Sequence, residues 1–93
     1  MQVEFRRLFF RDLGAIKDRK LRQRIESVIV EVEAANNLAE LRNIKAIEVH
    51  PSYYRIRIGD YRIGIYVEEN MIAFVRVLHR KEMWLFGNCY ANN

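Results

Sequence analysis

Residues 54–67 have the pattern of two β-strands joined by a two-residue turn. Apolar and polar side chains alternate through residues 54–58 and again through residues 61–67, and only Gly59-Asp60 separates the two runs. Period-two alternation is typical of strands with one buried face, and Gly-Asp between such runs is typical of a tight hairpin turn. The segment therefore predicts an antiparallel hairpin whose register follows from the turn.

Pairing across this turn separates an apolar face from a basic one. Opposed residues share a face of the sheet, so Ile58 belongs with Tyr61 and Arg57 with Arg62. The predicted core face consists of Tyr54, Ile56, Ile58, Tyr61, Ile63 and Ile65. The opposite face, called the arginine face below, consists of Arg55, Arg57, Arg62, Tyr53 and Tyr66.

Two guanidinium groups on opposed strand positions repel each other. At about 5 Å this repulsion is roughly 1 kcal/mol in water and about 3 kcal/mol at an effective dielectric constant of 20. A stable fold does not require the arrangement, whereas a bound phosphate would relieve it, because the guanidinium fork binds phosphate oxygens in pairs. The pattern leaves two interpretations open: a solvated sheet face or a phosphate-binding surface.

A helical pattern precedes the hairpin. Its period predicts an amphipathic helix over residues 19–35, with Asp18 as the N-cap. The apolar face of that helix is Leu21, Ile25, Val28, Ile29 and Val32. We also expect a strand over residues 2–5, a short helix ending near Gly14, a turn over residues 38–41 and a strand period from about Ala46. Helices followed by strands predict one α+β domain over residues 1–93.

The strand expected over residues 71–78 has two competing registers. Ile72 and Phe74 indicate one inward face, while Val75 and Val77 indicate the other, and both sets can point inward only if a β-bulge intervenes. We favour Val75 and Val77 as the inward residues. This choice places Arg76 and Arg80 on the arginine face.

Composition excludes several classes of protein. A net charge of +4 favours polyanions or an acidic protein as partners. No apolar run approaches the ~18 residues of a membrane span, and no signal peptide is present, so we expect a cytoplasmic protein without a membrane association. Cys89, in an expected loose tail after Gly87, is the single cysteine. Neither metal-ligand spacing nor a glycine-rich phosphate loop occurs, and no cofactor is expected.

The run YYRIRIGDYRIGIYV, followed by VLHRKEMW, resembles toxins of the RelE/ParE family from type II toxin–antitoxin systems. The resemblance implies an N-terminal strand and two helices packed on a twisted antiparallel sheet. It implies a ribosome-dependent, metal-independent endoribonuclease, which cuts mRNA in the ribosomal A site when the 2′-hydroxyl attacks the neighbouring phosphate. The implied partners are mRNA, the ribosome and a small acidic antitoxin, whose charge complements that of the toxin.

The same resemblance gives roles to individual residues. Arg55 and Arg57 occupy the paired basic positions of the first hairpin strand, Arg62 follows the turn, and Arg80 stands in the closing strand. Arg57, Arg62 and Arg80 are expected to stabilise charge on the phosphorane, and His79 is the candidate for proton transfer. RNA and phosphate binding is assigned to Arg55, Arg57, Arg62, Arg76, Trp84 and Tyr53.

Two departures from the family pattern leave alternatives open. The paired basic positions are often lysine in the family, and lysine can release a proton whereas arginine does not. The family motif often ends in tyrosine where this chain has Trp84, which can stack on a base or plug the edge of the core. The alternatives are a non-enzymatic, ParE-type inhibitor of DNA gyrase and an inactive toxin-fold protein that only binds its antitoxin or RNA.

Overall fold

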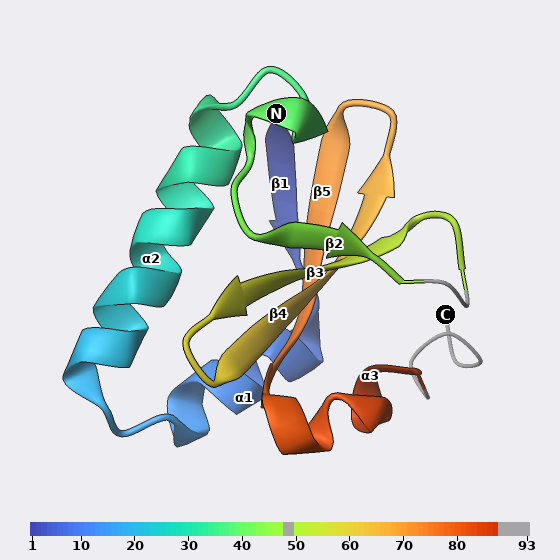
Figure 1. Ribbon diagram of the computed structural model, residues 1–93. Coiled ribbons are helices and arrows are strands. Elements are labelled where there is room, and N and C mark those ends of the chain that lie inside the picture. The colour runs from blue at the N-terminus through green and yellow to red at the C-terminus, as the bar shows by residue number, and fades with distance from the viewer. Residues whose placement is uncertain (48–49, 88–93) are drawn as a thin grey trace.

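The computed structural model describes residues 1–47 and 50–87, which form three α-helices and one five-stranded sheet (Figure 1). The strands are β1 (Gln2–Phe5), β2 (Ile44–Ala46), β3 (Tyr53–Ile58), β4 (Tyr61–Glu68) and β5 (Met71–His79). The helices are α1 (Arg7–Ala15), α2 (Arg19–Ala34) and α3 (Trp84–Gly87), with 3₁₀ turns η1 (Leu38–Glu40) and η2 (Arg80–Glu82). The predicted α+β class is confirmed. Cys89 and the tail predicted to be loose lie outside the described residues.

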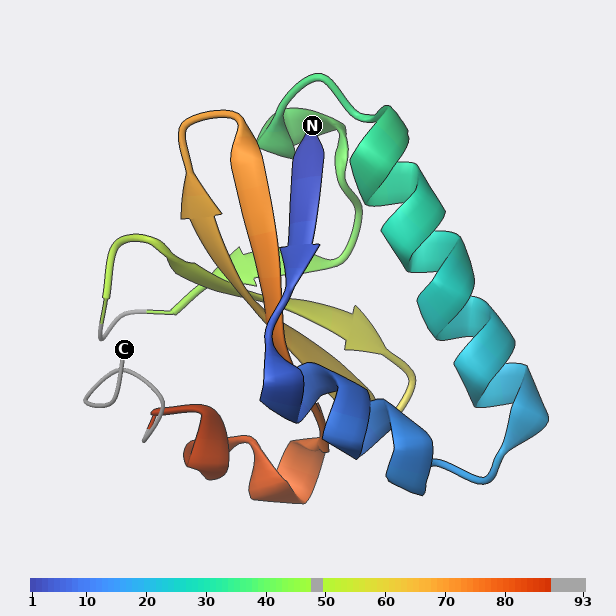
Figure 2. The ribbon, with the colours of Figure 1, turned by 180° about the vertical axis from the view of Figure 1, so that it is seen from behind.

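The sheet has the order β1-β5-β4-β3-β2. β1 runs parallel to β5 and leads directly into α1 (Figure 2), while the other neighbours are antiparallel. The predicted hairpin register is confirmed, because Arg57 pairs with Arg62 and Ile58 with Tyr61. Gly59 has a φ of 58°, a left-handed conformation that glycine adopts without steric cost. The turn chemistry read from the sequence therefore sets the register of the whole hairpin.

The long helix also begins as predicted. The Asp18 carboxylate accepts hydrogen bonds from the backbone N–H groups of Lys20 and Leu21, at 3.0 and 3.3 Å. These bonds satisfy N–H groups that have no partner within the helix. None of the helices in the described part of the chain is long and apolar enough to cross a membrane.

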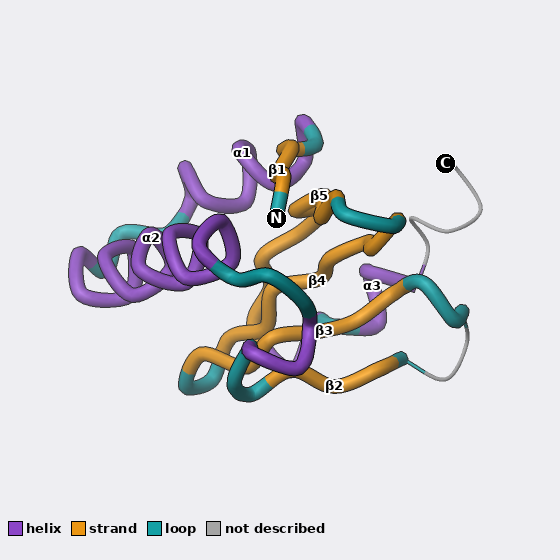
Figure 3. The backbone as a smooth tube through the Cα atoms, turned by 90° about the horizontal axis from the view of Figure 1, so that it is seen from above, coloured by secondary structure: helices purple, strands orange, loops and turns teal. Residues whose placement is uncertain are grey.

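Helices cover the two faces of the sheet unequally. Figure 3 shows α1 and α2 on one side of the sheet and α3 on the other. The core under α1 and α2 consists of Phe9, Ile16, Leu21, Ile25, Val32, Ile56, Ile58, Ile63, Ile65, Ile72, Phe74 and Val77. A second cluster, on the side of α3, consists of Tyr53, Ala73, Val75, Leu78 and Phe86. The predicted core face thus receives the amphipathic helix, and part of the opposite face is covered as well.

A β-bulge interrupts the ladder between β4 and β5. Gly64 pairs with Arg76, whereas the next residue, Ile65, pairs with Phe74, so Val75 is the extra residue on β5. An extra residue shifts the alternation of the strand by one position. The two registers that compete in the sequence are therefore both present, on either side of the bulge.

Because of the bulge, the orientation of this strand differs from the predicted one. Ile72, Phe74 and Val77 all pack in the core under α1 and α2. Val77 was expected there, but Val75 was also expected and instead packs with Phe86 on the side of α3. The prediction for Val75 is wrong, because it assumed uninterrupted alternation.

Arg76 lies opposite Gly64, on the predicted side of the sheet, but its side chain is buried. Its Nε and Nη2 donate hydrogen bonds to the Asp12 carboxylate of α1, at 2.6 and 3.0 Å, and the backbone N–H of Val77 donates to the same carboxylate at 3.1 Å. Arg76 is only 7% exposed. The guanidinium group is therefore not open to RNA, because it is buried in the pair with Asp12.

Candidate phosphate-binding site

The hairpin and the end of β5 bring together the four arginines expected at the site. Arg57 lies opposite Arg62, and Arg55 lies two residues further along the same face. The backbone N–H of Arg80 donates to the carbonyl oxygen of Asp60 at 2.7 Å, which ties the end of β5 to the hairpin turn. This bond explains how an arginine beyond the sheet joins the cluster on the hairpin.

Arg62 is held in place by its own hairpin. Its Nη1 donates to the carbonyl oxygens of Gly59 and Tyr61, at 2.9 and 3.0 Å. These bonds fix the guanidinium group beside the turn and leave the remaining N–H donors for another acceptor. The group is therefore oriented before any ligand arrives.

Arg62 also experiences the charge of its neighbours. Partial burial, followed by repulsion from Arg55, Arg57 and Arg80, lowers the pKa of Arg62 below its ordinary value, while the carboxylate of Asp60 raises it. Repulsion of this kind is significant only between charges that lie close together. The four guanidinium groups consequently form one electrostatic unit, which the single carboxylate of Asp60 neutralises only in part.

His79 lies apart from this unit. It pairs with Tyr61, so it shares the core-face side of the sheet with Tyr61 and not the face of Arg62. Its ring meets the Tyr61 ring edge-on at 5.4 Å, and its Nδ1 accepts a hydrogen bond from the backbone N–H of Lys81 at 3.1 Å. His79 therefore caps η2, the turn that begins with Arg80.

α3 covers the remaining part of the arginine face. Phe86 packs directly over Gly64, where a Cβ atom would lie 2.6 Å from the phenylalanine ring. Tyr53 was expected on the open surface but is 3% exposed, with its ring 5.4 Å from that of Phe86. Its predicted placement is wrong because α3 folds back over it. Trp84 is 68% exposed, which rules out the interpretation that it plugs the core edge.

Lys45 belongs to the same face, although no pattern in the sequence selects it. It pairs with Arg55 across β2 and β3, so the two side chains project from one side of the sheet. A pocket of about 330 Å³ is lined by Asn43, Ile44, Lys45, Arg55, Arg57 and Arg62. The face of Lys45 could not be predicted from the sequence, because β2 has only three residues, too few to show alternation.

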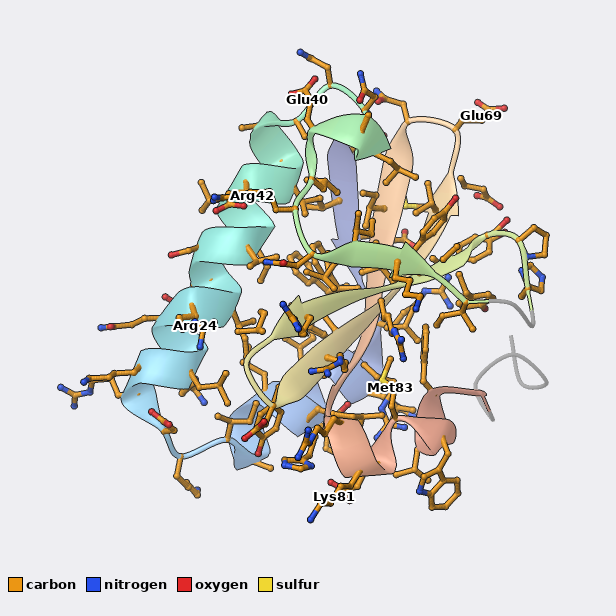
Figure 4. All side chains as sticks on the ribbon, in the orientation of Figure 1. Arg24, Glu40, Arg42, Glu69, Lys81 and Met83 are labelled. Carbon is orange, nitrogen blue, oxygen red and sulfur yellow. The ribbon has the colours of Figure 1, made fainter. Side chains whose placement is uncertain are left out.

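A second arginine-lined hollow lies between α2 and the sheet. Arg24 of α2 comes within 3.3 Å of the position that a Cβ atom on Gly59 would occupy. Arg24 and Arg42 lie beside α2 in Figure 4 and line this groove of about 260 Å³ together with Arg57. Arginines thus continue from the hairpin toward α2, where Glu31 also lines the groove and lies 3.7 Å from Arg42. Within the described residues, no group of His, Cys, Asp and Glu could hold a metal ion.

Comparison with known proteins identifies the family of this fold. Residues 3–84 match the family model described as the ParE toxin of type II toxin–antitoxin systems. The chain belongs to this toxin family. A curated relative, Toxin RelE3 of Methanocaldococcus jannaschii, is 44% identical over 85 residues, which cover 90% of this chain and 96% of the relative. The protein is therefore a RelE-like toxin of a type II toxin–antitoxin system.

Solved structures agree with the fold of the toxin. A RelB–RelE antitoxin–toxin complex from Methanococcus jannaschii matches with a TM-score of 0.77 and 40% identity, over 89% of this chain and 96% of the matched chain. The intact RelBE complex of E. coli matches with a TM-score of 0.66 and 16% identity, over 84% and 94% of the two chains. The second match supports the fold alone. The predicted RelE/ParE-like fold is confirmed.

The predicted site residues of this toxin fall into three groups. One group forms the charged cluster: Arg55, Arg57, Arg62 and Arg80. A second group is exposed or half-exposed beyond the cluster: Trp84 and His79. A third group is buried in the fold: Tyr53 and Arg76. Only the first group has the shared, exposed surface that a phosphate group requires.

Proposed function

We propose that this toxin is a ribosome-dependent endoribonuclease that cuts mRNA in the A site, in the cytoplasm, with arginines and not a metal ion stabilising the charge. The observation that carries the proposal is the convergence of four arginines: Arg55, Arg57 and Arg62 share a face of the hairpin, and the backbone N–H of Arg80 is bonded to the hairpin turn. An RNA phosphate supplies the negative charge that this cluster lacks, and paired N–H donors match its oxygens. The RelE name of the curated relative supports the same branch of the family.

The arginines have a direct role in the proposed reaction. When the 2′-hydroxyl oxygen attacks phosphorus, negative charge grows on the non-bridging oxygens of the phosphorane. We assign the stabilisation of that charge to Arg57, Arg62 and Arg80, and the binding of the backbone beside it to Arg55; their shared face and the bond from Arg80 to the turn support this assignment. The bonds from Arg62 to the turn carbonyls favour this role, because a donor that is already oriented requires no reorganisation during the reaction.

Other residues support the site from outside it. Trp84 is exposed on the short helix that follows η2, and we assign to it the stacking of an RNA base. His79 acts here as a positioning residue, because its Nδ1 caps the turn that begins with Arg80. Arg76 and Tyr53 have no part in the proposal, since both are buried in the fold.

The ribosome and an antitoxin complete the proposal. No residue of the arginine cluster is a strong base, so correct positioning of the mRNA must supply much of the rate, and the ribosome provides that positioning. RelE proteins of M. jannaschii and E. coli were solved in complex with RelB antitoxins. We assign to this toxin a cognate small acidic antitoxin, whose charge would neutralise the basic face.

A translation reaction tests the proposed function. Added toxin should cut mRNA in the A-site codon and should cut the same RNA far more slowly without ribosomes. Arg80→Ala should lower the cleavage rate by roughly 100-fold or more, since it removes a charge that stabilises the transition state. Arg11→Ala is the matched control, because Arg11 is exposed on α1, the helix that packs against the opposite side of the sheet.

The test separates the three functions open to this family. Intact mRNA together with inhibited supercoiling by DNA gyrase would replace the ribonuclease proposal with a ParE-type one. Intact mRNA and active gyrase would identify a toxin fold that only binds its partners. Either result leaves the fold and the family unchanged.

A further inference from the structure

The proposed cleavage has an unmet chemical requirement. The 5′-oxygen that leaves phosphorus must receive a proton, and general acids contribute about 10²–10⁴-fold to such steps. The guanidinium groups of the arginine face do not release protons. His79 lies on the other side of the sheet with its Nδ1 engaged in a hydrogen bond. Another titratable side chain on the arginine face would meet this requirement.

We propose that Lys45 is the general acid that protonates the leaving 5′-oxygen, an inference that rests on the proposed ribonuclease function. Lys45 lies opposite Arg55 and lines one pocket with Arg55, Arg57 and Arg62. Among the residues that the structure describes, no acidic one lines that pocket. Lysine ordinarily carries a proton near neutral pH and can release it, so Lys45 is the residue in the pocket lining that can act as an acid.

The register of β2 brings the amine within reach of a phosphate on the arginines. The backbone N–H of Arg57 donates to the carbonyl oxygen of Asn43 at 3.0 Å, so Asn43 marks the level of Arg57 on the neighbouring strand. Lys45 lies two residues beyond Asn43, which is about 7 Å along the strand, and adjacent strands lie about 4.8 Å apart. The flexible lysine side chain and the long arginine side chains project from the same face and line one pocket, so the amine can approach a phosphate group held by Arg57 and Arg62.

The amine of Lys81 is less well placed for this role than that of Lys45. Lys81 follows Arg80 on η2, and Figure 4 shows its side chain directed away from the sheet. Lys45, in contrast, projects from the sheet face that carries the arginines. The geometry therefore favours the lysine of β2 as the proton donor.

The step balances as a transesterification. The 2′-hydroxyl oxygen forms a bond to phosphorus and its proton passes to water, while the bond from phosphorus to the 5′-oxygen breaks. The ammonium of Lys45 gives its proton to that oxygen, so the products are a 2′,3′-cyclic phosphate and a 5′-hydroxyl. The neutral amine then regains a proton from solvent.

A sulfur-bridged mRNA tests this assignment. A thiolate leaves phosphorus without needing a proton, so an mRNA with a 5′-bridging sulfur at the scissile bond does not require the acid. On ordinary mRNA, Lys45→Met should cut at least ~100-fold more slowly than the unaltered toxin. On the sulfur-bridged mRNA the two rates should agree within a few-fold. Lys45→Arg should behave like Lys45→Met, because arginine keeps the charge but does not release its proton.

Controls and refuting outcomes complete the experiment. Lys20→Met removes an exposed lysine from α2, on the other side of the sheet, and should leave both rates unchanged. Thermal unfolding of each variant verifies that it is folded. Equal losses on both mRNAs, or full activity of Lys45→Arg on ordinary mRNA, would show that Lys45 supplies only positive charge and would overturn the assignment. If the unaltered toxin cuts neither mRNA, the proposed function itself fails, and this inference with it.

Discussion

Replacing Arg76 by methionine should destabilise the toxin by breaking a buried ion pair. Arg76 and Asp12 have side chains that are 9% and 10% exposed, and their shortest nitrogen–oxygen distance is 2.6 Å. Methionine retains most of the apolar stem but removes both hydrogen bonds to the carboxylate. Asp12 would then remain buried with the backbone N–H of Val77 as a donor at 3.1 Å.

The expected loss is large for a chain of this size. Breaking a buried ion pair from one side costs about 3–5 kcal/mol, because the remaining charge is uncompensated. The two lost hydrogen bonds lead to a similar figure, since bonds to charged groups contribute about 1.5–3 kcal/mol each. Small domains have free energies of unfolding of only about 5–15 kcal/mol, so Arg76→Met should leave a marginally stable protein.

A double-mutant cycle in chemical denaturation measures this pair. Asp12→Leu combined with Arg76→Met removes both charges and should recover most of the loss, since apolar replacement of a whole buried pair is often close to neutral. The control is the exposed pair of Arg80 and Asp60, 3.9 Å apart, where Arg80→Ala should cost no more than about 1 kcal/mol. A cost below about 1 kcal/mol for Arg76→Met, or a double variant no more stable than the single ones, would refute this account of the pair.

Two further predictions concern neighbouring positions on β4. Ile63 is fully buried under α2, so Ile63→Ala should lower the free energy of unfolding by about 2–5 kcal/mol, whereas Arg62→Ala should leave it nearly unchanged or slightly raised and abolish mRNA cleavage. Equal destabilisation in denaturation experiments would contradict the assignment of the two faces. Gly64→Ala introduces a Cβ atom 2.6 Å from the Phe86 ring, so it should cost about 1–3 kcal/mol and expose the chain around α3 to proteases. An unchanged digestion pattern would show that α3 is not held by this contact.

The hairpin could be predicted from the sequence because two independent signals agree there. Alternation determines which residues share a face, and the Gly59-Asp60 turn leaves one register that satisfies it. The pairing of Arg57 with Arg62 follows from those two facts alone. The prediction that Arg80 joins them came from the register chosen for the next strand and from the family resemblance, and the backbone bond to Asp60 holds it there.

The errors arise where local pattern does not determine the structure. β5 is buried on both faces, so its residues are apolar in both registers; this conflict indicates a bulge but does not show at which residue it lies. Tyr53 was misplaced because α3 has only four residues, too few for a helical period. One signal was present: Gly64 interrupts a strand, and a glycine in a strand interior often marks the close approach of another group, here Phe86.

The two faces of the hairpin explain how the toxin tolerates its clustered charge. Repulsion among the arginines acts on the exposed side, where water and splayed side chains weaken it. Burial of Ile56, Ile63 and Ile65 on the other side stabilises the same two strands. Because adjacent residues of a strand point to opposite faces, the cluster can be dense in arginine without removing any isoleucine from the core. Because the buried isoleucines fix the two strands, the arginines on the other face are held at a fixed spacing before a phosphate binds.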